Sequence, residues 1–179
     1  MKSYIIWLLA TGARKEAMLD LTLERCNMKD RLIELNPPNR RQTTKYRPTI
    51  RMPEVIVPLV SRLNRRHSKI THVIGLKQTR LGSPHESWNY AREKAGLDKQ
   101  VNSYSLRHTI SRELSRRQVS MYEIKSHLGH KPQELDITAV YAPYNPSFLK
   151  AAAAGIDSFF AELRGVSVPI DDFLKYFSG

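Results

Sequence analysis

The sequence predicts a mainly α-helical domain that carries one small three-stranded antiparallel β-sheet, an α+β fold. The first observation is that apolar residues recur at helical spacing, for example from Glu54 to His67. The second is a pair of short strand-like runs in "LERCNMKDRLIEL", joined by a turn at Lys29–Asp30, with a third run in "RPTIRMP". The third is the length of 179 residues, which fits a single domain with a hydrophobic core.

Start and stop signals divide the helical part of the chain. The first predicted helix reaches about Ala10 and ends at Thr11–Gly12, since a glycine after the last apolar residue is a common helix end. A second helix is expected near Ala13–Leu21. The stretch "SPHE" combines an N-cap serine, a first-turn proline and a glutamate, so it predicts a helix over about Ser83–Ala95.

Two later helices also have start signals. Ser120 and Glu123 have the spacing of a capping box. Asn145–Pro146 precedes the alanine-rich run "SFLKAAAAGIDSFFAEL". Between the second and third predicted strands, "NPPNRRQTTKY" is polar, basic and rich in proline, so we expect a loop there.

The composition narrows the class of protein. Lys and Arg total 29 against 17 Asp and Glu, and the net charge of +12 predicts a polyanionic partner such as nucleic acid or an anionic membrane surface; a well-solvated basic surface is the alternative. A single cysteine, Cys26, cannot form an intrachain disulfide, which favours a reducing cytoplasm. The apolar run "YIIWLLA" is far shorter than the roughly 20 residues that span a bilayer, so we interpret it as a buried helix.

Four motifs stand in a fixed order along the chain. They are "TGAR" with Arg14, "YSLRHT" with Arg107, "LGHK" with His130 and "TAVYAPY" with Tyr141. Each motif alone is weakly informative, but the ordered set resembles the catalytic domain of the tyrosine recombinases, the phage integrase superfamily. The resemblance runs from about Ile5 to Phe160, and it is strongest to integrase-like proteins of phages and integrated elements in proteobacteria.

This resemblance implies a chemistry that needs no metal, ATP or other cofactor. Tyr141 would attack the phosphodiester and store its energy as a covalent 3′-phosphotyrosine. Arg14 and Arg107 would bind the non-bridging oxygens, because guanidiniums stay charged and bond in pairs. Lys45, in the predicted basic loop, would protonate the leaving 5′ oxygen, and His130 would bond the scissile phosphate or manage the tyrosine proton.

The chain departs from the family pattern in three places. Tyr104 stands where the family usually has a histidine, and a phenol can donate a hydrogen bond to phosphate but is a poor base at neutral pH. The family's commoner lysine position is earlier in the loop, where this chain has Thr43–Thr44. The step from His130 to Tyr141 is also longer than the family's common one.

The resemblance also implies partners and organisation. Double-stranded DNA is the expected substrate, with a homotetramer on DNA and a monomer without it, in the bacterial cytoplasm, with no membrane and no small-molecule substrate. Residues 1–165 correspond to the catalytic domain and 166–179 to a tail, either passed to a neighbouring protomer or folded back; the family's upstream core-binding domain is not in this chain. The residues expected to line DNA are Arg40, Arg41, Arg47, Lys77 and Arg80.

Other interpretations remain open at this stage. Arg14 could be a surface residue paired with Glu16 or Asp20, His130 could only follow a helix end, and Tyr141 could be a core aromatic. His108 and His127 are expected to be packing or surface histidines. The run "ELSRRQVSMYEIKSHLGHKPQ" also resembles a helix-turn-helix, so a DNA-binding regulator and an inactive recombinase relative are the rival functions.

Overall fold

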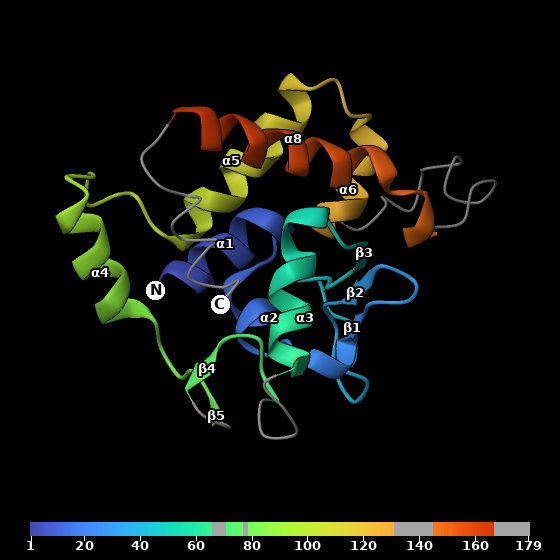
Figure 1. Cartoon of the computed structure of the whole chain (residues 1–179), viewed down its shortest axis with the longest axis horizontal. Coiled ribbons are helices and arrows are strands. Elements are labelled where there is room, and N and C mark those ends of the chain that lie inside the picture. The colour runs from blue at the N-terminus through green and yellow to red at the C-terminus, as the bar shows by residue number, and fades with distance from the viewer. Residues whose placement is uncertain (66–70, 77–78, 131–144, 167–179) are drawn as a thin grey trace.

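A computed structural model describes residues 1–65, 71–76, 79–130 and 145–166, and it confirms the mainly helical fold with a small antiparallel sheet (Figure 1). The α-helices are α1 (Lys2–Thr11), α2 (Lys15–Leu19), α3 (Val57–Arg65), α4 (His85–Lys94), α5 (Ser103–Arg116), α6 (Met121–Leu128) and α8 (Lys150–Val166). Short 3₁₀ turns are η1 (Leu23–Arg25), η2 (Glu54–Ile56) and η3 (Pro146–Phe148).

The three-stranded sheet forms as the sequence predicts. Its strands β1 (Cys26–Asn27), β2 (Leu32–Glu34) and β3 (Thr49–Arg51) are antiparallel in the order β1-β2-β3. Ile33 in the central strand pairs with Cys26 on one side and Ile50 on the other. Because all three side chains are buried, the period of two along each strand fixes the register against the core.

A second hairpin joins β4 (Gly75–Leu76) to β5 (Thr79–Arg80), and the sequence did not predict it. Each strand is two residues long, which is too short to show an alternating pattern. Backbone bonds hold the segment before it to the residues that follow α2, from Leu23 N to Thr71 O at 2.9 Å and from Val73 N to Leu21 O at 3.0 Å.

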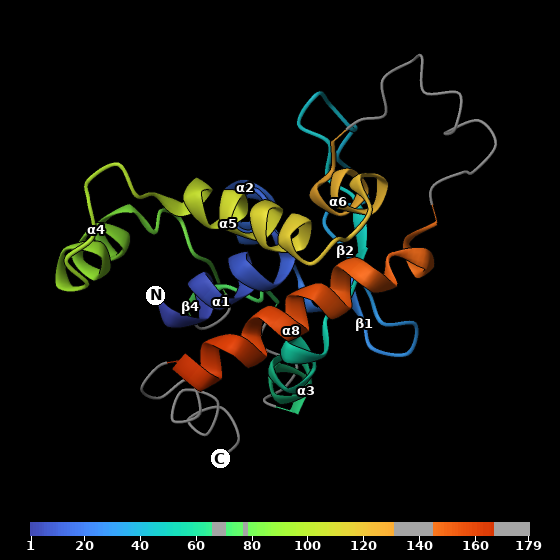
Figure 2. The same cartoon turned by 90° about the horizontal axis from the view of Figure 1, so that it is seen from above.

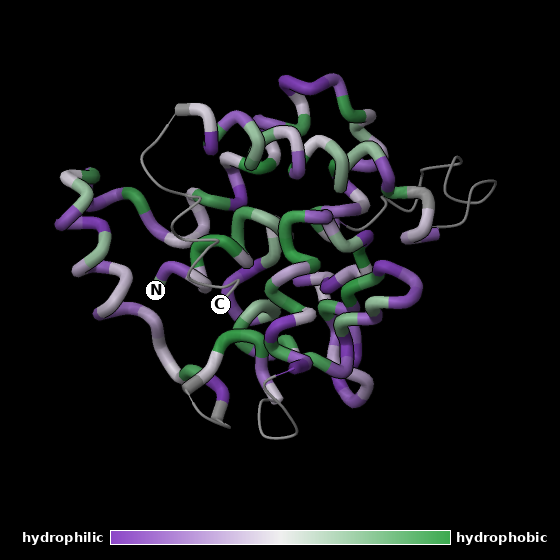
Figure 3. Tube along the Cα trace, in the orientation of Figure 1, coloured by the Kyte–Doolittle hydropathy of each residue, from purple (hydrophilic) through white to green (hydrophobic). Residues whose placement is uncertain are grey.

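The hydrophobic core surrounds α1. Tyr4, Trp7 and Leu8 are almost completely buried, which confirms the interpretation of "YIIWLLA" as a buried helix. In Figure 1, α5, α6 and α8 lie above α1, while α2, α3 and the sheet lie below or beside it; seen from above in Figure 2, α5 and α8 flank α1. Figure 3 shows that the hydrophobic segments concentrate in this centre. Within the part of the chain that the structure describes, no helix is both long and apolar enough to cross a membrane.

Helix ends follow the predicted signals with two differences. Gly12 ends α1 with a left-handed backbone (φ 59°), as expected. Helix α2 is shorter than predicted, because Arg14 has an extended backbone and the helix begins only at Lys15. Helix α4 begins at His85 rather than at Pro84, and its far end at Gly96 is as predicted.

The predicted capping box at Ser120 forms only in part. The Ser120 hydroxyl accepts a hydrogen bond from Glu123 N at 3.2 Å, as expected. The Glu123 carboxylate does not return to Ser120 and instead accepts from Ala152 N at 2.9 Å, in the first turn of α8. A side chain of α6 therefore caps a different helix.

Helix α8 provides a second cap of the same kind. Asp157 Oδ2 and Oδ1 accept hydrogen bonds from Glu54 N at 3.0 Å and Val55 N at 2.9 Å, at the start of η2 and α3. Burial raises the pKa of Asp157, while these two backbone donors lower it. Backbone N–H groups at the start of α8 and of η2, which leads into α3, thus find hydrogen-bond acceptors in carboxylates far away in the sequence.

Candidate active site

Three backbone segments meet at the candidate site: the end of α1, the end of α6 and the loop between β2 and β3. Two glycines permit this close approach. A Cβ atom on Gly12 would lie 2.7 Å from Leu128 Cδ2, and one on Gly129 would lie 2.8 Å from Tyr46 O and 2.5 Å from Pro48 Cδ. Both glycines also have a positive φ, so any other residue would bring both strain and a clash.

Arg107 lies at the centre of this junction. It comes from α5 and is only 4 % exposed. Its Nη1 donates to Gly12 O at 2.7 Å and its Nη2 donates to Leu128 O, so the guanidinium joins the end of α1 to the end of α6. Burial lowers the pKa of Arg107 to about 10, with a further contribution from the neighbouring Arg14, while Tyr104 raises it. The guanidinium is therefore still charged at neutral pH.

Arg14 lies beside Arg107 and uses the same turn. Its Nη1 donates to Tyr46 O at 2.7 Å and, more weakly, to Gly129 O at 3.5 Å. Burial lowers its pKa too, Tyr104 raises it, and Arg47 lowers it. Neither arginine pairs with a carboxylate within the described ranges, so the alternative of a surface pair with Glu16 or Asp20 is wrong.

His130 follows directly after the glycine that ends α6. Its backbone N–H donates to Lys125 O at 2.9 Å, which shows that the turn is indeed a helix end, while its side chain is exposed. Partial burial lowers the pKa of His130, and the cations Arg107, Arg14 and Lys125 lower it further. The imidazole is therefore neutral at physiological pH and able to accept a proton.

Tyr104 lies one helical turn before Arg107 on α5. It is 51 % exposed, and its ring packs edge-to-face against His108 with 4.6 Å between centroids. Its phenol influences the pKa of both arginines, so its hydroxyl end lies on their side of the helix. His108 is exposed, which agrees with the expectation of a surface histidine.

His127 is the buried histidine of α6, also as expected. It is 1 % exposed, and neither ring nitrogen makes a hydrogen bond of ordinary geometry within the described part of the chain. Burial lowers its pKa to about 4; the backbone of Thr11 partly opposes this, and the cation of Arg107 adds to it. It is a neutral packing residue behind the arginine.

The loop between β2 and β3 carries Lys45, which is exposed. Its backbone N–H donates to Thr43 Oγ1 at 3.2 Å. The next residue, Tyr46, supplies the carbonyl that binds Arg14. In Figure 2 this loop lies beside α6, on the side where the turn at Gly129 ends that helix. Lys45 is thus adjacent in sequence to a residue in direct contact with the arginine pair.

The residues predicted to line DNA differ in how free their charges are. Arg41 is exposed and makes no ion pair within the described ranges. Arg40 is occupied inside the loop, where it donates to Asn36 Oδ1 at 2.7 Å and Thr43 Oγ1 at 3.0 Å. The remaining two described residues pair with acids of α2 and its C-cap. Those pairs are Arg47–Asp20 at 2.8 Å, Arg80–Asp20 at 2.9 Å and Arg80–Glu16 at 3.0 Å.

Sequence reasoning did not find the groups that hold the arginines. These are the carbonyls of Gly12, Tyr46, Leu128 and Gly129, and no side-chain pattern marks a backbone acceptor. The glycines of "TGAR" and "LGH" are the visible signal, since their packing brings these carbonyls together. Tyr141 and Lys77 lie outside the described residues, and so does the predicted tail 166–179 apart from Val166, which ends α8.

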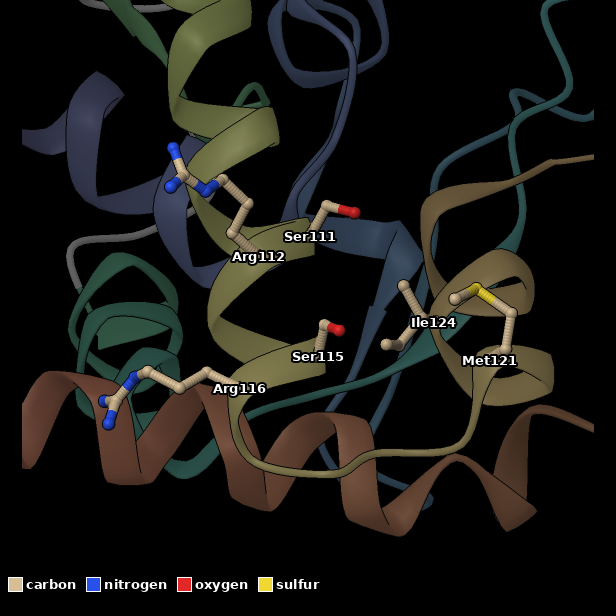
Figure 4. A pocket seen from close by; sticks show the side chains of 6 residues that line it. All are labelled: Ser111, Arg112, Ser115, Arg116, Met121 and Ile124. Atoms are coloured by element: carbon tan, nitrogen blue, oxygen red, sulfur yellow. The ribbon is translucent and has the colours of Figure 1, made fainter.

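A groove between α5 and α6, of about 450 Å³, contains none of the predicted catalytic residues (Figure 4). Ser111 and Ser115 point from α5 toward Met121 and Ile124 of α6, while Arg112 and Arg116 extend from the other side of α5. In the part of the chain that the structure describes, no three His, Cys, Asp or Glu side chains group closely enough to hold a metal ion.

The mainly helical fold, with its small sheet beside the arginine junction, is that of a tyrosine recombinase catalytic domain. A family model described as the phage integrase family matches residues 1–147. The chain therefore belongs to the phage integrase family, whose members act as site-specific recombinases with DNA as their partner. No curated protein matches the sequence.

Proposed function

We propose that this chain is the catalytic domain of a site-specific DNA recombinase that cuts and rejoins DNA through a covalent phosphotyrosine at Tyr141. The observation that carries the proposal is the arginine pair. Two charged guanidiniums converge on one turn, where both bond to backbone carbonyls, and neither pairs with a carboxylate within the described residues. Such donors can exchange a carbonyl for the more strongly accepting oxygens of a phosphate.

The proposed reaction assigns one role to each polar group. The Tyr141 oxygen attacks phosphorus while its proton passes to His130, whose lowered pKa keeps the imidazole neutral and receptive. Arg14 and Arg107 stabilise the negative charge on the non-bridging oxygens, and Tyr104 donates a further hydrogen bond. As the bond from phosphorus to the 5′ oxygen breaks, Lys45 gives that oxygen a proton. The reverse sequence rejoins the strands without an external energy source.

A covalent trap tests this function. The full chain is incubated with suicide DNA from the flanks of its own gene, in which the cut end leaves by diffusion, and the adduct is digested for mass spectrometry. A recombinase gives DNA attached to Tyr141, whereas a helix-turn-helix regulator or an inactive relative shifts DNA mobility without any adduct.

Two tyrosines that stand close together provide the matched comparison. Tyr141→Phe should abolish the adduct and retain DNA binding, because only one hydroxyl is removed. Tyr144→Phe should still form the adduct, since a proline disfavours helix at the residue before it and we therefore expect the two tyrosines to point in different directions. Phosphate found on Tyr144, or cleavage by the Tyr141→Phe protein, would sink the mechanism.

The proposal extends to assembly. We expect a monomer without DNA and a tetramer on two duplexes, with residues 1–165 as the catalytic domain and the tail passed to a neighbour. Deletion of residues 167–179 keeps α8 complete. The deletion should spare single-site cleavage and impair synapsis; a protein that simply unfolds would instead assign the tail to the core.

A further inference from the structure

The loop between β2 and β3 has an internal framework built from polar side chains. Asn36 Nδ2 donates to Arg40 O at 2.8 Å, and the Arg40 guanidinium returns to Asn36 Oδ1 and reaches Thr43. A loop of this length with so many side-chain bonds to its own backbone has a defined shape before any partner binds. Further bonds fix the end of the loop that carries Lys45.

Gln42 clamps the backbone of Arg47 from both sides. Its Nε2 donates to Arg47 O at 2.8 Å and its Oε1 accepts from Arg47 N at 3.1 Å. One side-chain amide thus imitates the paired bonds of a β-ladder across the base of the segment 43–46. Lys45 and Tyr46 lie within the segment that this clamp closes.

Asp20 fixes the same residue through its side chain. Asp20 Oδ2 lies 2.8 Å from Arg47 Nη1, and the Arg47 side chain is only 11 % exposed. A partly buried, hydrogen-bonded ion pair of this kind is held more firmly than a surface pair. Arg47 therefore serves as a brace in the structure, although the sequence predicted a DNA contact.

These contacts close a ring through the arginine site. Helix α2 has Arg14 at its N-cap and Asp20 at its C-cap. Arg14 binds Tyr46 O, the neighbouring Arg47 binds Asp20, and Gln42 holds the backbone of Arg47. Lys45 is attached to this ring at Tyr46, so the position of its backbone depends on both Gln42 and Asp20.

We propose that Gln42 and Asp20 are positioning residues for Lys45, acting through Arg47. This inference rests on the proposed function, in which Lys45 is the general acid. A misplacement of about 1 Å at a reacting group is enough to slow a reaction by roughly 100-fold. Loss of either brace should therefore weaken proton donation to the leaving oxygen more than DNA binding.

The test compares two leaving groups. Gln42→Met preserves the length of the side chain and removes its amide, and Asp20→Asn preserves shape and removes the charge. Each protein is assayed at saturating DNA for the rate of adduct formation on ordinary suicide DNA and on DNA with sulfur at the 5′ bridging position. A thiolate leaves without a proton, so only a defect in the general acid is relieved by sulfur.

We expect both variants to slow cleavage of ordinary DNA by roughly 10- to 100-fold with little change in DNA affinity, and sulfur to restore most of that loss. Lys45→Met is the reference for a complete loss of the general acid, and sulfur at the 5′ bridging position should restore its cleavage rate in the same way. Gln100→Met and Asp30→Asn, the same exchanges in exposed loops away from the site, should behave as wild type.

Two results would overturn the inference: unchanged cleavage by Gln42→Met and Asp20→Asn, or an equal loss on both kinds of DNA. The second result would mean that the braces support the fold or the arginines rather than the lysine. Failure of the proposed function is a separate outcome, because then the wild-type protein itself would form no adduct on either DNA.

Discussion

Arg107 and Arg14 donate hydrogen bonds to the carbonyls of two consecutive residues, Leu128 and Gly129, at the end of α6. One helix end therefore orients both guanidiniums, although the arginines come from segments far apart in the sequence. No acid is needed to hold the two positive charges together, because the carbonyl dipoles at a helix C-terminus carry partial negative charge. The cations remain available to a phosphate for the same reason.

The two arginines should differ in what their loss does to the fold. Arg107→Ala leaves the buried carbonyls of Gly12 and Leu128 without these hydrogen-bond partners. Each carbonyl should lower the free energy of unfolding by about 1–3 kcal/mol. Arg14→Ala affects a half-buried group and should lower the free energy of unfolding much less. Both should slow adduct formation by at least roughly 100-fold, the typical effect of losing one transition-state donor. Urea unfolding and the suicide-DNA assay check this; equal stability of the two variants would contradict it.

The rate of cleavage should depend on pH through His130. Because the pKa of His130 is lowered, its neutral form persists below the ordinary imidazole value of about 6.5. The rate at saturating DNA should stay level from neutral pH down to about that value and fall only at lower pH, as the base becomes protonated. The His130→Gln protein should cleave slowly, and its rate should no longer fall at low pH. A wild-type rate that rises on acidification would rule out His130 as the base.

Stability should decline in acid because of His127. Its folded pKa of about 4 lies below the ordinary value of 6.5, so the unfolded chain binds the proton more readily and stability is lost as the pH falls through this window. The loss is on the order of 3 kcal/mol, reached below about pH 4. His127→Leu should flatten the pH dependence of urea unfolding, while His108→Gln, on the surface, should leave it intact. A variant as acid-sensitive as the wild type would refute this role.

Salt dependence should separate Arg41 from Arg40. The logarithm of DNA affinity falls with the logarithm of salt at about −0.9 for each phosphate neutralised. Arg41→Glu reverses an exposed charge. It should make the slope less steep by about 0.9, the value of one phosphate contact, without altering thermal stability. Arg40→Glu should also flatten it, but it additionally breaks the bonds to Asn36 and Thr43 and so loosens the loop. An unchanged slope for Arg41→Glu would argue that the loop does not contact DNA.

Local signals in the sequence predicted most of the fold. The end of α1 at Gly12, the hairpin around Lys29–Asp30 and the start of α6 at Ser120 each depend on a few neighbouring residues. The β4–β5 hairpin was not predicted, because strands of two residues are too short to show an alternating pattern. The partner of Glu123 escaped because a carboxylate three residues after a helix start fits a capping box whether or not it bonds elsewhere.

The candidate site was predictable as a set of residues and not as an arrangement. Arg14, Arg107 and His130 came from motifs in a family order, and the structure brings these three together. The pairing of Arg47 and Arg80 with Asp20 could not be seen in the sequence. Ion pairs join positions that only the tertiary fold makes neighbours. The sequence therefore cannot distinguish a free basic residue in a loop from one that is paired with an acid.

The caps that α6 and α8 supply to other helices bear on the order in which the chain can fold during synthesis. Helix α8 begins after residue 147, where the family match ends. Yet Ala152, Ile156 and Phe160 are buried in the core, and Asp157 caps the turn η2 that leads into α3. A nascent chain that has left the ribosome only as far as the arginine site still lacks these groups. The domain therefore reaches its stable form late, once nearly all of it has emerged, so that DNA meets the arginine junction only in a nearly complete domain.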